Sequence, residues 1–335
     1  MKWQRLVSAG ALTALVAFTV LANTTPRLDL TGYQDSGGAI TVLRGGDSTD
    51  PYFAMQALLL AHENGMDVSV PASQFADWLV PHQKPDGTFD RFCRISSVGG
   101  SGGAAASWRA CKTADADDSL LAIWIKLLET MPTQLRAKPV LAKSHQIATA
   151  SLNHLLQPSR GIYMVSPVYL HGLFMDNLEV WSLKAHQKGA GSPAEAAKLS
   201  KAIHDTFWDP VNKRFLVSTQ LEQRTQKPAF YPDHVAQIFP LLVGYTDLPE
   251  PSAAYYRRWM GVHRAEWLKH SEADYPWGLL AVLALNQKDT TSARCWLRDA
   301  SPLRHSARWA VTDEAAHQIL TARGLKPATT TTACA

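Results

Sequence analysis

Acidic residues recur along this chain immediately before, or at the beginning of, apolar segments with helical spacing. The acidic groups are Asp50, Asp115 with Asp117 and Asp118, Asp176 with Glu179, Asp233, Glu272, and Asp313 with Glu314. The first four groups lie roughly 60 residues apart and the later ones roughly 40, which is the length of a repeated supersecondary unit. Carboxyl groups brought together by such repeats could transfer protons, so the elements that carry them decide what chemistry is open to them.

Two carboxyl groups on either side of a glycosidic bond are enough to hydrolyse it. They lie roughly 5–5.5 Å apart in retaining enzymes and 6.5–9.5 Å apart in inverting enzymes. One of them must hold its proton near neutral pH, which burial or a neighbouring anion achieves. The spacing predicts that Asp117 or Asp118, together with Glu179 or Asp233, forms this acid/base set.

Helix capping is the alternative interpretation of the same acids. An aspartate before a helix accepts hydrogen bonds from free backbone N–H groups and complements the helix dipole. Asp176 and Glu179 have the spacing of a capping box. Three aspartates within four residues, at positions 115–118, exceed what one helix end needs, so at least one of them is expected to serve another purpose.

Aromatic and polar residues near the acids are candidates for substrate binding, because flat rings stack on sugar faces. The candidates are Asp50, Tyr52, Arg91, Trp124, Asp176, Trp181, Tyr231, His234, Tyr275 and Trp277. For each aromatic residue a place in the core is the competing interpretation. For Arg91 it is an exposed surface charge, and for His234 it is a hydrogen-bonded structural position.

The composition of the 335-residue chain disfavours several classes of function. Its net charge is +4, but Lys and Arg form no stripe interleaved with aromatic residues, so nucleic acid is a poor candidate partner. No phosphate-binding glycine loop, HExxH or GxSxG motif is present, and no spacing requires a metal ion or other cofactor.

The N-terminus has the pattern of a secretory signal peptide. A short basic region, residues 1–5, precedes about 17 residues without a charge, and small side chains follow at residues 20–22. We therefore expect export to the periplasm or cell envelope, with an uncleaved membrane anchor as the alternative.

The cysteines agree with export. Cys93 and Cys111 bracket a loop rich in glycine and serine, and we expect them to form a disulfide. Cys295 and Cys334 could form a second bridge; otherwise Cys295 is a buried thiol and Cys334 lies in a free tail.

Helical periodicity predicts about eleven helices with few strands. They pair as 51–64 with 71–82, 117–130 with 142–156, 176–187 with 193–207, 233–244 with 252–270 and 277–286 with 290–300, and 311–322 follows alone. Short extended segments are expected at 39–43, 88–95, 161–168 and 215–219. The predicted organisation is a signal peptide at 1–22, a linker at 23–46, one helical domain at 47–325 and a threonine-rich tail at 326–335.

Alternating inner and outer helices predict an all-α fold, an (α/α)6 toroid of helical hairpins. The inner helices are expected to start near Asp50, Asp117, Asp176, Asp233, Trp277 and Asp313. The more apolar segments, such as 120–128 and 279–285, should be inner, and 192–205 should be outer with a solvated face.

Several short motifs resemble the six-hairpin glycosidase-like superfamily. They are Asp-Ala-Asp-Asp-Ser at 115–119, Asp-Asn-Leu-Glu-Val-Trp at 176–181, Phe-Trp-Asp-Pro at 207–210 followed by Arg214 and Phe215, and Tyr-Pro-Asp-His at 231–234. The resemblance implies a funnel at the N-termini of the inner helices, where carboxylates perform acid/base chemistry. Asp-Ala-Asp-Asp-Ser also resembles the acid motif of class II terpene cyclases, but an exported chain of this length is atypical of them.

The expected function is therefore that of an exported glycoside hydrolase acting on a polysaccharide or oligosaccharide. Two alternatives remain open. A uronate-polysaccharide lyase or epimerase would need a base such as Tyr231 or His234 and a cation such as Arg91. A non-catalytic glycan-binding protein of polysaccharide assembly or export would keep the funnel without a working acid pair.

Overall fold

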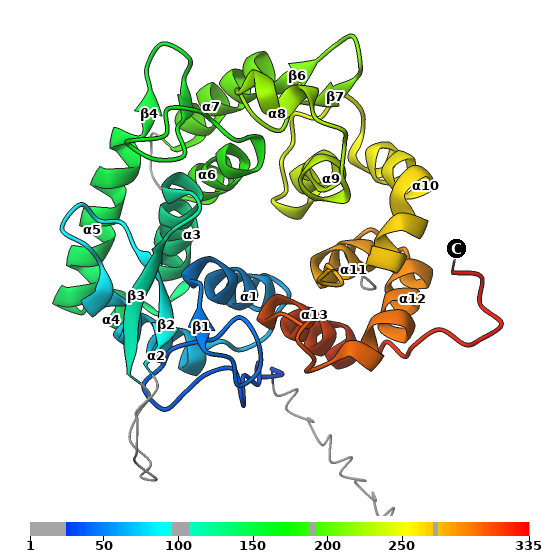
Figure 1. The fold of residues 1–335 in the computed structure, drawn as a ribbon, viewed down its shortest axis with the longest axis horizontal. Helices are drawn as coiled ribbons and strands as arrows, with labels where there is room; N and C mark the ends of the chain where they lie inside the picture. Colours follow the sequence, from blue (N-terminus) through cyan, green and yellow to red (C-terminus); the bar gives the residue numbers. More distant parts are fainter. Residues whose placement is uncertain (1–24, 96–106, 188–191, 271–273, 335) are drawn as a thin grey trace, which may run out of the picture.

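The chain forms an α/α barrel built of two concentric rings of helices (Figure 1). The computed structural model describes residues 25–95, 107–187, 192–270 and 274–334. The inner ring consists of α1 (Pro51–Glu63), α3 (Asp117–Thr130), α6 (Phe174–His186), α9 (Val235–Leu242), α11 (Gly278–Asn286) and α13 (Val311–Ala322). Each inner helix contacts the next and α13 contacts α1, so the ring is closed.

The outer ring covers the inner one. Its helices are α2 (Ser69–Leu79), α5 (Pro139–His154), α7 (Ser192–Phe207), α10 (Ser252–His270) and α12 (Thr290–Ala300). Each contacts the inner helix that precedes it in sequence. Short helical segments lie in the connections between these helices: η1 (Val80–His82), α4 (Thr133–Arg136), α8 (Leu221–Thr225), η2 (Phe230–His234) and η3 (Ser301–Leu303).

The last inner helix has no helical partner after it, and the segment before β1 takes that place. The backbone N–H of Val311 donates to the carbonyl of Val42 at 2.8 Å. Gln318 exchanges two hydrogen bonds with the backbone of Asp29. Residues 25–47 thus lie along the outside of α13 and α1 (Figure 1) instead of forming the expected linker, because their apolar side chains, such as Leu28 and Ile40, are buried there.

The few strands lie in the connections. A three-stranded antiparallel sheet has the order β1 (Ser48–Thr49), β2 (Asp90–Arg94) and β3 (Trp108–Thr113). In its register Ser48 pairs with Cys93 and Cys93 pairs with Arg109. Two smaller hairpins pair β4 (Leu156–Gln157) with β5 (Ile162–Tyr163), and β6 (Trp208–Asp209) with β7 (Arg214–Phe215).

The inner helices are apolar on nearly all sides because they pack against both rings. In α11 every residue from Gly278 to Ala284 is buried, and in α3 nearly all from Asp118 to Leu128 are. A helix that is hydrophobic all round must be enclosed. The predicted starts of the inner helices lie within two residues of the observed ones, so the (α/α)6 prediction is confirmed.

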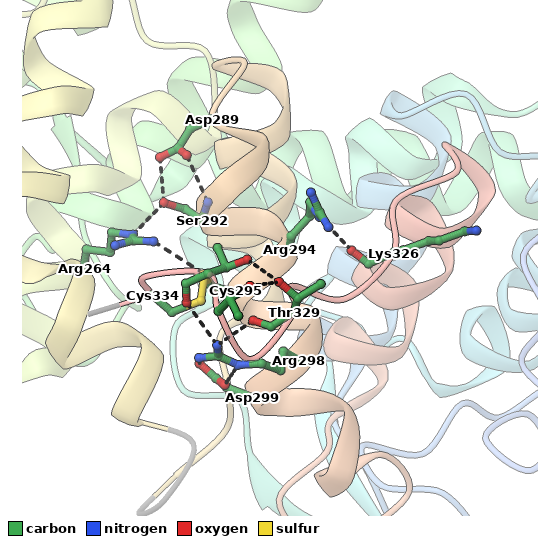
Figure 2. Close-up of a disulfide and its surroundings, with 12 residues drawn as sticks. Arg264, Asp289, Ser292, Arg294, Cys295, Arg298, Asp299, Lys326, Thr329 and Cys334 are labelled. Carbon is green, nitrogen blue, oxygen red and sulfur yellow. Dashed lines mark hydrogen bonds and ion pairs between the residues drawn. A yellow bond between two sulfur atoms is a disulfide. The ribbon is translucent and has the colours of Figure 1, made fainter.

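Two disulfides fasten the connections. Cys93 of β2 and Cys111 of β3 are bonded, with their Cα atoms 5.8 Å apart. Cys295 of α12 is bonded to Cys334 of the C-terminal tail (Figure 2). The tail lies along α12, where the Ala328 N–H donates to the carbonyl of Arg294. The expected signal peptide and the glycine-rich loop lie outside the described residues. Within the described part of the chain, no helix combines the length and hydropathy needed to cross a membrane.

Candidate active site

Three carboxyl groups meet where α3 and α6 begin, at one end of the barrel. Asp118 is the second residue of α3, while Asp176 and Glu179 belong to the first two turns of α6. Residues three apart on a helix share a face, so Asp176 and Glu179 project the same way, toward Asp118. Asp118 is fully buried and Glu179 is only 7% exposed, whereas Asp176 keeps partial access to solvent.

Burial raises the pKa of all three acids. The pKa of Asp176 rises to about 7, chiefly through desolvation and then through the charge of Asp115. Desolvation and the charge of Asp176 hold the pKa of both Asp118 and Glu179 well above the usual range. Asp118 and Asp176 lie close enough for the charge of Asp176 to raise the pKa of Asp118. This acid cluster (Asp118, Asp176 and Glu179) can therefore hold protons near neutral pH.

Each acid of the cluster also keeps one oxygen uncommitted. Oδ2 of Asp118, Oδ2 of Asp176 and Oε2 of Glu179 are buried and have no hydrogen-bond partner among the described residues. Unpaired buried oxygens are costly to stability. Their concentration at one end of the barrel is therefore typical of a functional site.

Tyr52 of α1 holds one oxygen of Glu179. Its hydroxyl donates to Oε1 of Glu179 at 2.8 Å and accepts from Nε2 of Gln56 at 3.0 Å. Glu179 is held on one oxygen while its other oxygen stays free. Gln56 was not a candidate from the sequence, although it lies four residues after Tyr52 on the same predicted helix, a spacing that brings two side chains together.

Arg91 of β2 links two further acids at the rim of the barrel. Its Nε lies 2.9 Å from Oδ2 of Asp50, and its Nη2 lies 3.5 Å from Oδ1 of Asp115. Asp50 also caps α1 by accepting from the Tyr52 N–H at 3.0 Å, and burial raises its pKa. Asp115 is different, because its side chain is 87% exposed. It is an open carboxylate beside the buried cluster.

Aromatic rings border the same opening. The ring of Tyr231 lies 5.4 Å from that of Trp277 at a tilt of 30°. Burial, followed by the charges of Asp176, Asp115 and Glu179, raises the pKa of Tyr231 to about 12, so its hydroxyl lies near the acids. Trp277 adopts a left-handed backbone conformation with φ 53°, a strained state that is concentrated at functional sites.

A second aromatic group lies on α1. Phe53 contacts Tyr275 edge-on at 6.0 Å and Tyr52 at 6.1 Å. Tyr52 and Tyr275 were candidates from the sequence and Phe53 was not, although the position of Phe53 beside Tyr52 at the start of an inner helix was a usable signal.

The remaining candidates lie outside this opening. Asp117 interacts with Lys84, Asp86 and Asp90, and burial raises its pKa to about 6. It points away from Asp118 because successive residues of a helix are about 100° apart. Asp233 accepts from the Ala229 N–H at 3.0 Å and so closes a turn.

The other two tryptophans and His234 face the outer ring or the core. Trp124 is fully buried and donates to the Ser144 hydroxyl of α5. Trp181 packs edge-on against Tyr245. His234 bonds to Glu266 of α10 at 2.8 Å. These three residues are therefore placed by packing between the helix rings, away from the acid cluster.

Comparisons with known proteins define the fold. No protein-family model and no curated protein matches the sequence. Among solved structures, an uncharacterized conserved protein from Thermus thermophilus matches with a TM-score of 0.54 at 12% identity, over 87% of this chain and 97% of that one. GH63 mannosylglycerate hydrolase from the same organism, in complex with glucose, matches with a TM-score of 0.53 at 13% identity, over 87% of this chain and 98% of that one. The same enzyme in complex with Tris matches with a TM-score of 0.53 at 12% identity, again over 87% of this chain and 98% of that one. At this identity the likeness supports the six-hairpin glycosidase-like fold expected from the motifs.

Proposed function

We propose that this protein is an exported glycoside hydrolase whose proton donor is Asp176. The observation that carries the proposal is the acid cluster, in which three carboxyl groups with raised pKa values and unpaired oxygens meet at the mouth of a glycosidase-type barrel. Asp176 is the member with both a pKa of about 7 and partial access to solvent. A general acid is most effective when its pKa lies near the working pH.

The chemistry assigns complementary roles to Asp176 and Asp115. Asp176 gives its proton to the glycosidic oxygen as the bond to the anomeric carbon breaks. A water molecule attacks that carbon and passes a proton to Asp115, whose exposed carboxylate is held by Arg91. Asp118 returns a proton to Asp176 or shares it between turnovers. The reaction consumes one water and leaves both acids in their starting states after exchange with solvent.

Sugar rings would be held by the aromatic residues of the opening. Tyr231 is 51% exposed and lies over Trp277, and Phe53 and Tyr275 form the second wall. Flat rings with a polar edge suit the apolar face and the hydroxyl edge of a sugar. The substrate class we propose is an oligosaccharide or polysaccharide.

Hydrolysis fits better than elimination or epimerisation. A base that removes a proton beside a uronate must be ionisable near neutral pH, whereas the pKa of Tyr231 is about 12 and His234 is bonded to Glu266 of α10. Arg91, the candidate partner of a uronate, is paired with Asp50 and Asp115. A purely glycan-binding protein would have no use for three neighbouring acids with raised pKa values.

The test is a set of conservative variants assayed for reducing-sugar release on a panel of oligosaccharides and polysaccharides. Asp176→Asn and Asp115→Asn should each lower kcat by about 10²–10⁴-fold while the protein remains folded. Asp313→Asn is the matched control. Asp313 is also a buried acid at the start of an inner helix with a pKa of about 7, but it is bonded to the Gly278 and Ala310 N–H groups.

Asp313→Asn should lower stability and leave kcat within about threefold of the wild type. Wild-type activity in Asp176→Asn would overturn the assignment of the donor. Absence of reducing-sugar release together with saturable binding would favour the glycan-binding alternative. Unsaturated products absorbing near 235 nm would favour a lyase.

A further inference from the structure

Two histidines and one glutamate converge on the outer side of the barrel, away from the acid cluster. His234 ends the η2 turn, and His263 and Glu266 lie on α10. Oε2 of Glu266 lies 2.8 Å from Nδ1 of His234 and 3.2 Å from Nδ1 of His263. One ligand atom from each of the three residues lies within 4.8 Å of the other two.

The surrounding residues hold this group in place. His263 and Glu266 are three residues apart on α10 and so share one face of the helix. The indole Nε1 of Trp259 donates to the backbone carbonyl of His234 at 2.8 Å, and the ring of Trp259 lies 5.3 Å from that of His263. The imidazole rings of the two histidines are 4.2 Å apart. The three side chains are therefore preorganised by packing.

Solvent reaches part of the group. The side chains of His234 and His263 are only 24% and 19% exposed, while that of Glu266 is 42% exposed. Two ring nitrogens thus meet at one carboxylate oxygen, and the carboxylate is the most exposed of the three groups. A metal site needs both convergent ligand atoms and an entry path.

We propose that His234, His263 and Glu266 bind a divalent transition-metal ion, with zinc as the best match. Imidazole nitrogen with carboxylate oxygen suits zinc and its neighbours, whereas magnesium and calcium prefer all-oxygen sites. Tetrahedral ligands about 2.0–2.1 Å from zinc are roughly 3.3 Å from one another. The nitrogen–oxygen distances of 2.8 and 3.2 Å therefore need to widen by about 0.5 and 0.1 Å, and water would complete the coordination.

The ion would join two parts of the α9–α10 hairpin. His234 belongs to the same five-residue turn as Tyr231, which borders the mouth, and His263 and Glu266 belong to the outer helix. A metal ion bound here would fix the turn to α10 and thereby restrain the ring of Tyr231. The expected role is structural, because the ligands lie away from the acid cluster.

The experiment measures zinc binding by isothermal titration calorimetry. The protein carries no histidine tag and is first stripped with EDTA. We expect one zinc ion per chain, no comparable heat with magnesium, and a higher melting temperature with zinc. X-ray absorption should show nitrogen or oxygen ligands at about 2.0–2.2 Å, with outer-shell scattering from two imidazole rings. His263→Gln and Glu266→Gln should each weaken zinc binding by more than about tenfold.

Two control variants separate this site from others. His145→Gln removes a histidine that is paired with Glu129, at 3.1 Å, and should leave zinc binding unchanged. Asp176→Asn should also leave it unchanged, because the acid cluster is separate. Melting curves of the metal-free variants check that they are folded. If either His263→Gln or Glu266→Gln fails to fold, the other variant still tests the site. Wild-type protein that binds no zinc, or equal zinc affinity in the wild type and both site variants, would overturn the proposal.

Discussion

The hydroxyl of Tyr52 donates to the carboxyl group of Glu179 at 2.8 Å, across 127 positions of the sequence. Tyr52 lies on α1 and Glu179 on α6, and α3 stands between these helices in the inner ring. The hydrogen bond therefore crosses the interior of the barrel in front of α3. It couples the packing of three inner helices to the position of a buried acid at the mouth.

Removal of that hydroxyl should destabilise the protein and loosen Glu179. Tyr52→Phe keeps the ring and deletes one donor, leaving both oxygens of a buried carboxyl group unpaired. The expected loss in the free energy of unfolding is about 1–2 kcal/mol, measured by urea denaturation. Tyr169→Phe is the control, because Tyr169 is 65% exposed. Equal stability of Tyr52→Phe and Tyr169→Phe would show that the bond contributes nothing.

The pH dependence of activity should show the titration of Asp176. Burial and the charge of Asp115 raise the pKa of this acid to about 7, and the proposed donor works only when protonated. We expect kcat/KM to fall as pH rises through about 7, by about tenfold per pH unit on the alkaline side. Asp115→Asn removes a nearby negative charge, so residual activity should fall at a lower pH. A flat profile between pH 5 and 9 would contradict the assignment of Asp176.

The fold was accessible from the sequence because its signals are local. Asp50 before Pro51 marks a helix start by capping and by the fixed φ of proline, and apolar runs such as that of α11 identify inner helices wherever they occur. The structural similarity to the GH63 enzyme assigns no role to single residues, because the two sequences are only 12–13% identical. The helix arrangement was thus predicted from the hydrophobic periodicity of this chain.

The direction of single side chains was not accessible in the same way. The helix α3 is apolar on nearly every side, so nothing in its pattern separates Trp124, which faces α5, from a residue that faces the mouth. Asp117 and Asp118 are neighbours of one type, and only packing decides which of them meets Asp176. His234 follows Asp233 at a helix entry, yet the turn at 230–234 directs its ring to α10. These differences depend on contacts between segments distant in sequence.

Replacement of Asp176 by asparagine should stabilise the protein at neutral and alkaline pH. The pKa of Asp176 is about 7 in the folded protein, against an ordinary value of 3.8 for an aspartate in water. The folded state therefore binds the proton more tightly than the unfolded state, and stability falls as pH rises from about 4 to 7. Asparagine does not ionise, so Asp176→Asn does not lose this stability as the pH rises.

Thermal and urea unfolding at several pH values would measure this effect. At pH 8 the free energy of unfolding of Asp176→Asn should exceed that of the wild type by at least about 1.4 kcal/mol, which corresponds to one pKa unit. The difference should shrink toward pH 4, close to the unfolded pKa of 3.8, where the folded wild type and a large fraction of the unfolded chains hold the proton. A stability difference that does not vary between pH 4 and 8 would contradict the raised pKa.

Glu314 should show the opposite dependence. Burial alone would raise its pKa, but hydrogen bonds from Arg304, Gln318 and Trp309 prevail and lower it to about 2. Arg304 forms two of these bonds, at 2.6 and 2.9 Å, and Trp309 donates at 3.0 Å. A carboxyl group with a lowered pKa stabilises the folded state fully above its unfolded pKa of about 4.5, and this contribution is lost as pH falls toward 2.

Glu314→Gln should therefore cost about 2 kcal/mol at pH 7, because it removes the charge that pairs with Arg304 and leaves that guanidinium half-buried. The gap from the wild type should close between pH 4.5 and 2. Glu195→Gln is the matched control, since Glu195 pairs with Lys184 but is 58% exposed; its effect should stay below about 1 kcal/mol at every pH. Urea unfolding of the wild type, Glu314→Gln and Glu195→Gln at pH 7, 4.5 and 3 measures how each stability difference depends on pH. A Glu314→Gln deficit that stays constant down to pH 3 would mean that lost packing, and not the paired charge, accounts for it.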